Sequence, residues 1–95
     1  MSESLFEITN GRRGAVPRRI AGKQEAAQAL AAAALWMING ARRDYETCVA
    51  SWSREIIDGL AVGETGTLEV RGDSFGKGVN PSGYLTGKAT AVRIA

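Results

Sequence analysis

Histidine is absent from the 95-residue chain, and cysteine occurs once, as Cys48. A disulfide therefore cannot form within one chain, and neither can a zinc site made of cysteine and histidine. The usual general base at neutral pH is also missing, because imidazole is the side chain that titrates nearest to pH 7. We predict a non-catalytic protein without metal or cofactor, in a reducing compartment.

The chain also lacks a long apolar run. The longest one, residues 29–38, has half of the roughly 20 residues that a membrane-spanning helix needs. Near the start, Glu3 and Glu7 lie where a secretory signal carries basic residues, and no apolar core follows them. We therefore expect a cytoplasmic protein without a membrane partner.

Charge is balanced in total but uneven along the chain. The formal net charge is +2, and hydrophobic and charged residues, at 44% and 23%, occur in the proportions of a globular protein. Residues 1–23 carry five cations and two carboxylates, whereas residues 44–69 carry six carboxylates and a single cation, Arg54. A chain polarised in this way suits a protein partner as well as a polyanion. Its length is that of one domain, so we predict a single domain over residues 1–95.

The first two strands are predicted from an alternating segment and a turn signal. Residues 4–9 alternate apolar and polar side chains and lead into Asn10-Gly11, a pair typical of tight hairpin turns. We predict a second strand over residues 12–17. Pro17 has no amide donor, so this strand ends there or lies at the edge of the sheet.

Two helices and two further strands are predicted after the hairpin. Residues 23–38 are rich in alanine and other strong helix formers. Residues 66–71 and 84–95 are typical of strands, on either side of a glycine-rich loop. The second helix, residues 42–58, carries an apolar stripe at helical spacing that we expect to face the core, namely Tyr45, Val49, Trp52 and Ile56.

These elements define the fold class. The order ββααββ predicts an α+β domain: a small four-stranded antiparallel sheet made of two hairpins, with two α-helices packed on one of its faces. The last strand extends to the C-terminal residues, so we expect it to pair with an internal strand. The alanines of the first helix permit close packing, either on the second helix or across a homodimer.

The four arginines of the hairpin are the clearest functional signal. Arg12 and Arg13 project to opposite faces of a strand, as do Arg18 and Arg19, so at most half of them share a surface. On one interpretation they keep an edge strand soluble and protect it from pairing with another chain. On the other interpretations they bind an acidic protein patch or the phosphates of a nucleic acid.

The two tryptophans are interpreted differently. Trp52 belongs to the apolar stripe of the second helix and is expected in the core. Trp36 lies away from the apolar face of the first helix, so it either packs under the edge of the sheet or is exposed. An exposed tryptophan beside an apolar helix is typical of a contact surface.

Two functional hypotheses follow. The first is a protein-binding module that acts as an adaptor or inhibitor of a larger protein. Compact chains of this kind are common in phages and mobile elements, and that association favours an inhibitor of a host protein. The second is a nucleic-acid-binding module that uses the arginine hairpin and the loop of residues 72–88 as basic arms. The candidate binding residues are Arg12, Arg13, Arg18, Arg19, Trp36, Arg71, Lys77 and Lys88.

Overall fold

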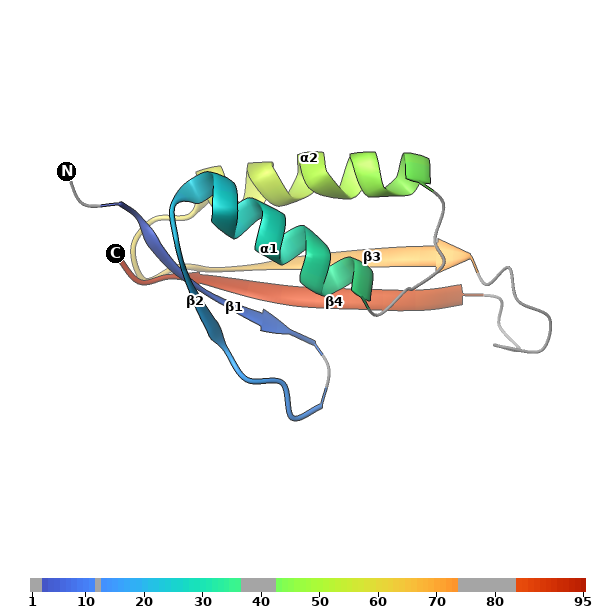
Figure 1. The fold of residues 1–95 in the computed structure, drawn as a ribbon, viewed down its shortest axis with the longest axis horizontal. Coiled ribbons are helices and arrows are strands. Elements are labelled where there is room, and N and C mark those ends of the chain that lie inside the picture. Colours follow the sequence, from blue (N-terminus) through green and yellow to red (C-terminus); the bar gives the residue numbers. More distant parts are fainter. Residues whose placement is uncertain (1–2, 12, 37–42, 74–83) are drawn as a thin grey trace.

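The structure, a computed structural model, describes residues 3–11, 13–36, 43–73 and 84–95 (Figure 1). At residues 36, 43–48, 71–73 and 84–86 the backbone alone is described. Within these segments the elements are β1 (Leu5–Asn10), β2 (Arg18–Ala21), α1 (Lys23–Trp36), α2 (Arg43–Gly59), β3 (Thr65–Asp73) and β4 (Tyr84–Arg93). The order ββααββ and the α+β class are as predicted.

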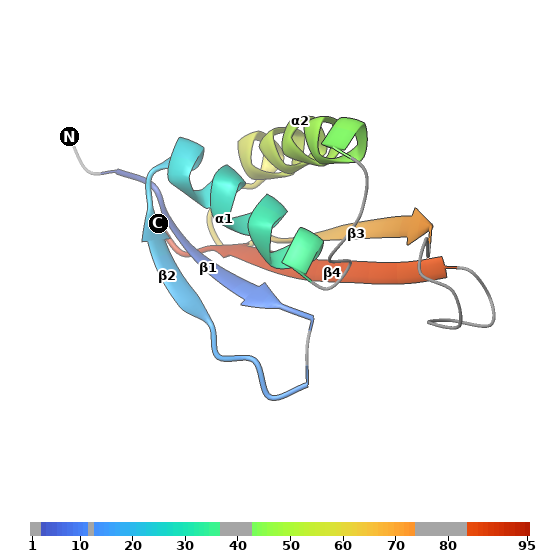
Figure 2. The same ribbon diagram turned by 45° about the vertical axis from the view of Figure 1, so that its right-hand side comes forward.

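The described strands form one antiparallel sheet in the order β2-β1-β4-β3. β4 therefore lies between two strands, which confirms that the C-terminal strand pairs internally. Both helices cover the same face of the sheet, and no described helix lies on the other face (Figures 1 and 2). The two ends of the described chain lie together, because the Leu5 amide donates to the Ala95 carbonyl at 3.0 Å.

The second strand of the first hairpin lies later in the chain than predicted. β2 covers Arg18–Ala21 instead of residues 12–17, and it lies at the edge of the sheet. Its first residue directly follows Pro17, whose missing amide hydrogen disfavours it within a ladder. The edge position expected from Pro17 is therefore confirmed, whereas the predicted boundaries of the strand are wrong.

The two-residue turn predicted at Asn10-Gly11 is also wrong. The Gly11 amide donates to the Lys88 carbonyl at 2.7 Å, so Gly11 continues the pairing of β1 with β4. A Cβ added to Gly11 would lie 2.8 Å from the Lys88 carbonyl oxygen, so only glycine permits this approach. The chain turns later instead, near Gly14, whose φ is 79°.

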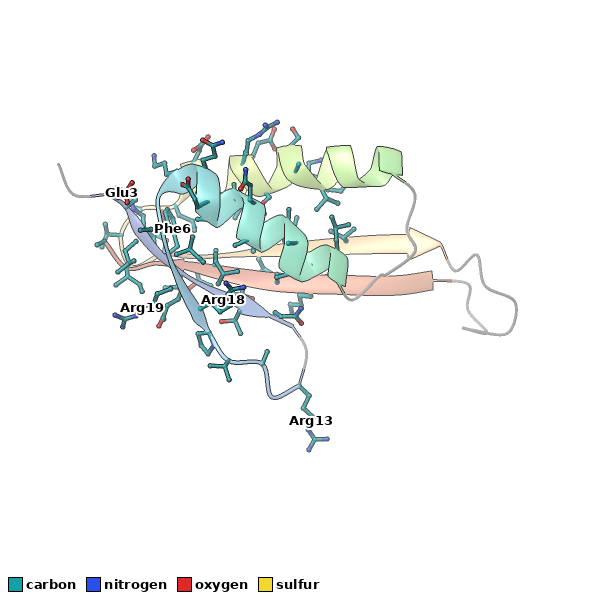
Figure 3. All side chains as sticks on the ribbon, in the orientation of Figure 1. Glu3, Phe6, Arg13, Arg18 and Arg19 are labelled. Atoms are coloured by element: carbon teal, nitrogen blue, oxygen red, sulfur yellow. The ribbon has the colours of Figure 1, made fainter. Side chains whose placement is uncertain are left out.

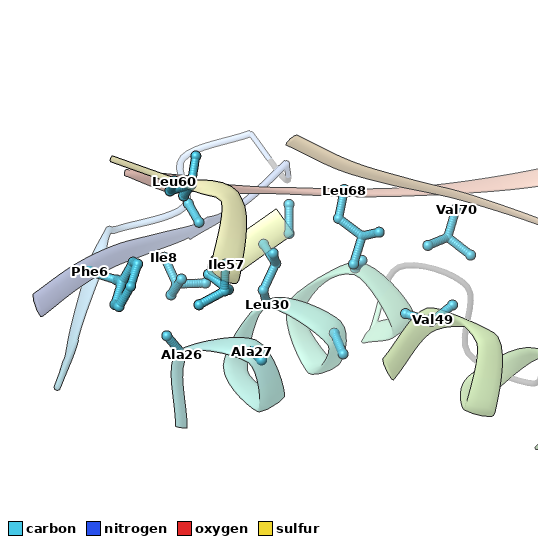
Figure 4. Close-up of a cluster of buried hydrophobic side chains, with 14 residues drawn as sticks. Phe6, Ile8, Ala26, Ala27, Leu30, Val49, Ile57, Leu60, Leu68 and Val70 are labelled. Carbon is cyan, nitrogen blue, oxygen red and sulfur yellow. The ribbon is translucent and has the colours of Figure 1, made fainter. Parts of the chain in front are cut away.

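The core lies between the two helices and one face of the sheet (Figure 4). Phe6 and Ile8 point from β1 toward the helices, and Ala91 of β4 lies opposite Ile8. Small residues in β4 let α1 pack closely on the centre of the sheet. The buried hydrophobic residues are Phe6, Ile8, Ala26, Ala27, Leu30, Ala31, Ala34, Val49, Ile57, Leu60, Leu68, Val70, Ala89 and Ala91.

The buried face of α2 is rotated from the predicted one. Val49 is fully buried as predicted, but Trp52 is 41% exposed, and the buried positions continue through Ser53 and Ile57. Ser53 fits because its hydroxyl donates to the Ala27 carbonyl of α1 at 2.5 Å, which holds the two helices close together. The expectation that Trp52 lies in the core is wrong, because Val49, Ser53 and Ile57 define the inward face of α2 and Trp52 lies beside that face.

The second predicted hairpin is formed by β3 and β4, with Leu68 opposite Ala89. The glycine-rich segment between them and the side chain of Tyr45 lie outside the described residues. None of the helices that the structure describes is long and apolar enough to cross a membrane.

Candidate functional site

A groove lies between α1 and the β1–β2 hairpin. Figure 2 shows that the backbones of α1 and the hairpin diverge along their length. The volume of the groove is about 610 Å³. We call it the α1–β2 groove. Its lining comprises Ile8, Asn10, Arg13, Gly14, Ala15, Val16, Arg18, Ile20, Ala29, Ala32 and Ala33.

Apolar side chains form the floor and one wall of the groove. Ile8 and Ile20 lie on the helix-covered face of the sheet, since Ile20 is opposite the buried Phe6 in the ladder. Ala29 and Ala33 of α1 are partly buried against the core. Alanine is the strongest helix former and its side chain ends at Cβ, so this wall lies close to the helix backbone.

Asn10 connects the hairpin to α1. Its side-chain amide donates to the Ala33 carbonyl at 2.7 Å, in a partly buried position. Ala33 lies in the last turn of α1, where backbone carbonyls have no partner within the helix. The hydrogen bond thus satisfies one of these carbonyls and fixes the spacing between the hairpin and the helix.

Two arginines line the rim of the groove. Arg18 is exposed and lies on the helix-covered side of β2, because its partner in the ladder is the buried Ile8. Figure 3 shows Arg13 extending from the tip of the hairpin and Arg18 lying nearer to the sheet. Neither Asp nor Glu occurs among the described lining residues, so the rim is cationic. Val16, which is 79% exposed, adds an apolar side chain to the same rim.

Arg19 and Lys88 lie on the opposite face of the sheet. The Arg19 Nε atom is 3.7 Å from Glu7 Oε1, and the side chains are 69% and 35% exposed, respectively. Exposed pairs of this kind contribute about 0–1 kcal/mol to stability. Lys88 is exposed and lies opposite Glu69 in the ladder between β4 and β3. Both cations therefore have a carboxylate as their neighbour on an adjacent strand.

The structure brings two of the predicted binding residues together. Arg13 and Arg18 share the rim of the α1–β2 groove, whereas Arg19 and Lys88 lie on the other face of the sheet. The predicted divergence of Arg18 and Arg19 is thus confirmed. The described side chains do not include those of Arg12, Trp36, Arg71 and Lys77.

The apolar lining of the groove is absent from the predicted binding residues. Val16 could have indicated a contact surface, because an apolar side chain beside Pro17 and among arginines is not expected to be buried in the core. The alanines of α1 gave a second signal, since they indicate a close contact. The face of β2 on which a residue lies depends on the register of β2 with β1. The strand predicted from the sequence, residues 12–17, has the wrong bounds and therefore the wrong register.

Neither a metal cluster nor a known relative identifies the site. The part of the chain that the structure describes contains no group of three or more cysteine or acidic side chains that could hold a metal ion. In comparisons with known proteins, no family model, curated protein or solved structure matches the chain. Function is therefore inferred from the groove and from the distribution of charge.

Proposed function

We propose that the protein is a small non-catalytic module that binds a larger protein through the α1–β2 groove, as an adaptor or an inhibitor. The observation that carries this proposal is the lining of the groove, which combines an apolar floor and wall with Arg13 and Arg18 at the rim. Burial of apolar surface drives protein association, and arginine is enriched where proteins meet.

The open shape of the groove favours a protein over a small molecule. Ala32 on one side and Val16 on the other are both exposed, so a small ligand would keep much of its surface in water. Small-molecule sites typically bury about 70–90% of the surface of their ligand. The surface of another protein covers both sides at once and removes Val16 from water.

The separation of charge supports the same proposal. The hairpin side of the molecule carries Arg13 and Arg18, whereas the described side chains of α2 expose two carboxylates and one cation, namely Glu55, Asp58 and Arg54. Separated charges of this kind orient an approaching protein and select partners of complementary charge. A partner with an acidic surface would be guided to the groove and repelled by α2.

We assign no reaction to the groove. The polar side chains among its described lining residues are the Asn10 amide and the guanidinium groups of Arg13 and Arg18. Guanidinium stays protonated in proteins and an amide does not titrate, so neither acts as a general base. This chemistry suits binding and orientation of a partner.

Nucleic acid is the second candidate partner. The described cations are divided, because Arg18 lies on the helix-covered side of β2 and Arg19 and Lys88 lie on the other face. A nucleic acid on one face would therefore meet only part of them. A gel shift of mixed DNA or RNA that weakens steeply with salt would favour this alternative over the protein partner.

Blocking the groove tests the proposal. Ala32→Trp places a large side chain at an exposed lining position, and Ala50→Trp places the same side chain at an exposed position of α2 outside the groove. Wild type and both variants are immobilised, and the proteins that they capture from an extract of the source organism are identified by mass spectrometry. We expect a partner that wild type and Ala50→Trp capture and Ala32→Trp loses. Equal capture by both variants would contradict the proposal.

A further inference from the structure

The α1 wall of the groove has the spacing of a helix-packing surface. Ala29, Ala32 and Ala33 lie at i, i+3 and i+4, so they share one side of the helix. On another side of α1, the alanine surface already packs on a helix, because Ser53 of α2 donates to the Ala27 carbonyl at 2.5 Å. Side chains this small permit the shortest distances between helix axes. The α1 wall of the groove therefore offers an incoming helix the same kind of alanine surface on which α2 packs.

The floor supplies sites for larger apolar side chains. Ile8 and Ile20 lie beneath the alanine wall on adjacent strands, and Ile20 is partly buried against the core. Val16 extends the apolar surface toward the rim, where it is 79% exposed. Ile8 is already buried in the core, so a helix with apolar residues along one face would cover Ile20 and Val16 together.

The charges are confined to the hairpin side of the groove. Arg13 and Arg18 come from the hairpin, whereas the α1 wall consists of alanine. No carboxylate neutralises them among the described lining residues. The flank of a bound helix that faces the hairpin would therefore be acidic, because carboxylates pair with guanidinium in bidentate geometry.

An added β-strand fits the hairpin edge less well than a helix fits the groove. β2 has four residues, and the Gly22 amide donates to the Ser4 carbonyl, so the even-numbered residues bond inward to β1. Of β2, this leaves Arg19 and Ala21 with backbone groups directed to the open edge. Two residues provide a short ladder for an extended segment, whereas the alanine wall provides a contact along the helix.

We propose that the α1–β2 groove binds an acidic amphipathic helix of the partner protein. Its apolar face packs on Ala29, Ala32 and Ile20, and the carboxylates on one flank pair with Arg13 and Arg18. This inference rests on the proposed function, because it names the partner element that the same groove takes.

A pair of model helices tests the inference. The first is a fluorescein-labelled peptide with leucine on one face and glutamate along the flanks, and the second has lysine in place of each glutamate. Fluorescence anisotropy measures the binding of both peptides to the full chain at low and moderate salt. We expect the wild type to prefer the glutamate peptide and the double variant Arg13→Glu/Arg18→Glu to prefer the lysine peptide. Each preference should be about tenfold in Kd, which is the change expected when two rim charges are reversed.

Two further variants distinguish the groove from the rest of the surface. Ala32→Trp should lose the binding of both peptides about tenfold or more, because it fills the apolar part of the groove. Arg19→Glu reverses an arginine of the same strand on the other face, and it should leave both affinities unchanged. Circular dichroism of each variant checks that the fold is retained.

Three outcomes would overturn the inference. The first is equal binding of the two peptides to the wild type, and the second is a preference that Arg19→Glu changes as much as the double variant does. The third is a labelled single-stranded DNA of matched charge that binds more tightly than the glutamate peptide and requires Arg13 and Arg18. If these results occur while Ala32→Trp still abolishes capture of a partner protein, the groove binds a protein by another element. If Ala32→Trp leaves that capture unchanged, the proposed function itself is wrong.

Discussion

Arg18 and Arg19 are adjacent in β2, yet they lie on opposite faces of the sheet and in different surroundings (Figure 3). Arg19 lies beside Glu7, with 3.7 Å between Nε and Oε1. Arg18 lines a groove whose described residues include no carboxylate. Two identical side chains therefore differ in what they offer to a ligand, because side chains alternate along β2 and place Arg18 opposite Ile8 and Arg19 opposite Glu7.

The two faces also differ in packing. On the helix-covered face, Phe6 and Val70 are buried, whereas on the other face Glu69 and Lys88 are exposed. We therefore expect substitutions of the residues buried under the helices to lower the free energy of unfolding, and substitutions of the exposed residues on the other face to change it little.

The largest effect is expected for Phe6→Ala. Phe6 is fully buried, so its truncation should lower the free energy of unfolding by about 3–5 kcal/mol. Glu7→Ala alters the neighbouring residue on the other face and should lower it by less than about 1 kcal/mol. Urea denaturation followed by circular dichroism measures both values. Similar losses for the two variants would show that the faces are not as different as described.

Two substitutions in α2 test which face of this helix is buried. Ile57→Ala removes a fully buried side chain and should destabilise the protein by about 2–5 kcal/mol. Trp52→Ala removes a larger side chain that is 41% exposed, so its loss should be smaller than that of Ile57→Ala. The same denaturation experiment ranks the two variants. A larger loss of unfolding free energy for Trp52→Ala would indicate that Trp52 lies on the buried face of α2, as the sequence predicted.

The connection between hairpin and helix is tested by Asn10→Ala. This change removes the hydrogen bond from the Asn10 amide to the Ala33 carbonyl, which should lower the free energy of unfolding by about 1 kcal/mol. Amide hydrogen exchange in β2 should become faster, because the hairpin loses one of its contacts with α1. Unchanged exchange in β2 would mean that Asn10 does not fix the spacing of the groove.

The smallest effect on stability is expected for the two adjacent arginines. Arg19→Ala removes an exposed ion pair and should lower the free energy of unfolding by about 0–1 kcal/mol, less at high salt. Arg18→Ala should leave stability within about 0.5 kcal/mol, since Arg18 is an exposed edge residue. Thermal unfolding at two salt concentrations distinguishes the two variants, because only the loss for Arg19→Ala should depend on salt. A marked loss for Arg18→Ala would give this residue a structural role instead of a binding role.

The order of the elements follows from local signals in the sequence. Alternation in residues 4–9, the alanine-rich segment of residues 23–38 and the strand-forming C-terminal residues each indicate their element without reference to the rest of the chain. Strand geometry likewise predicts that Arg18 and Arg19 diverge. These parts of the fold and of the site could be predicted because the information lies within a few residues.

The remaining features depend on contacts between distant segments. Asn10-Gly11 has the composition of a tight turn, but Gly11 pairs with Lys88 instead and thereby moves β2 along the chain. In α2, Ser53 faces α1 instead of the adjacent Trp52, and its hydroxyl donates a hydrogen bond to the Ala27 carbonyl. The lining of the groove depends on where β2 lies, and that position follows the pairing of Gly11 with Lys88. The apolar lining could therefore not be recognised from the hairpin sequence alone.

Binding of the partner at the α1–β2 groove is tested most directly by the alanine methyl groups of the chain. Ala29, Ala32 and Ala33 line the groove, whereas Ala50 and Ala61 are exposed elsewhere. The protein, labelled with ¹³C at its alanine methyl groups, is titrated with the partner captured by the wild type, and the methyl resonances are recorded. We predict that the resonances of the three groove alanines shift while those of Ala50 and Ala61 stay in place. Shifts confined to Ala50 and Ala61 would contradict the account.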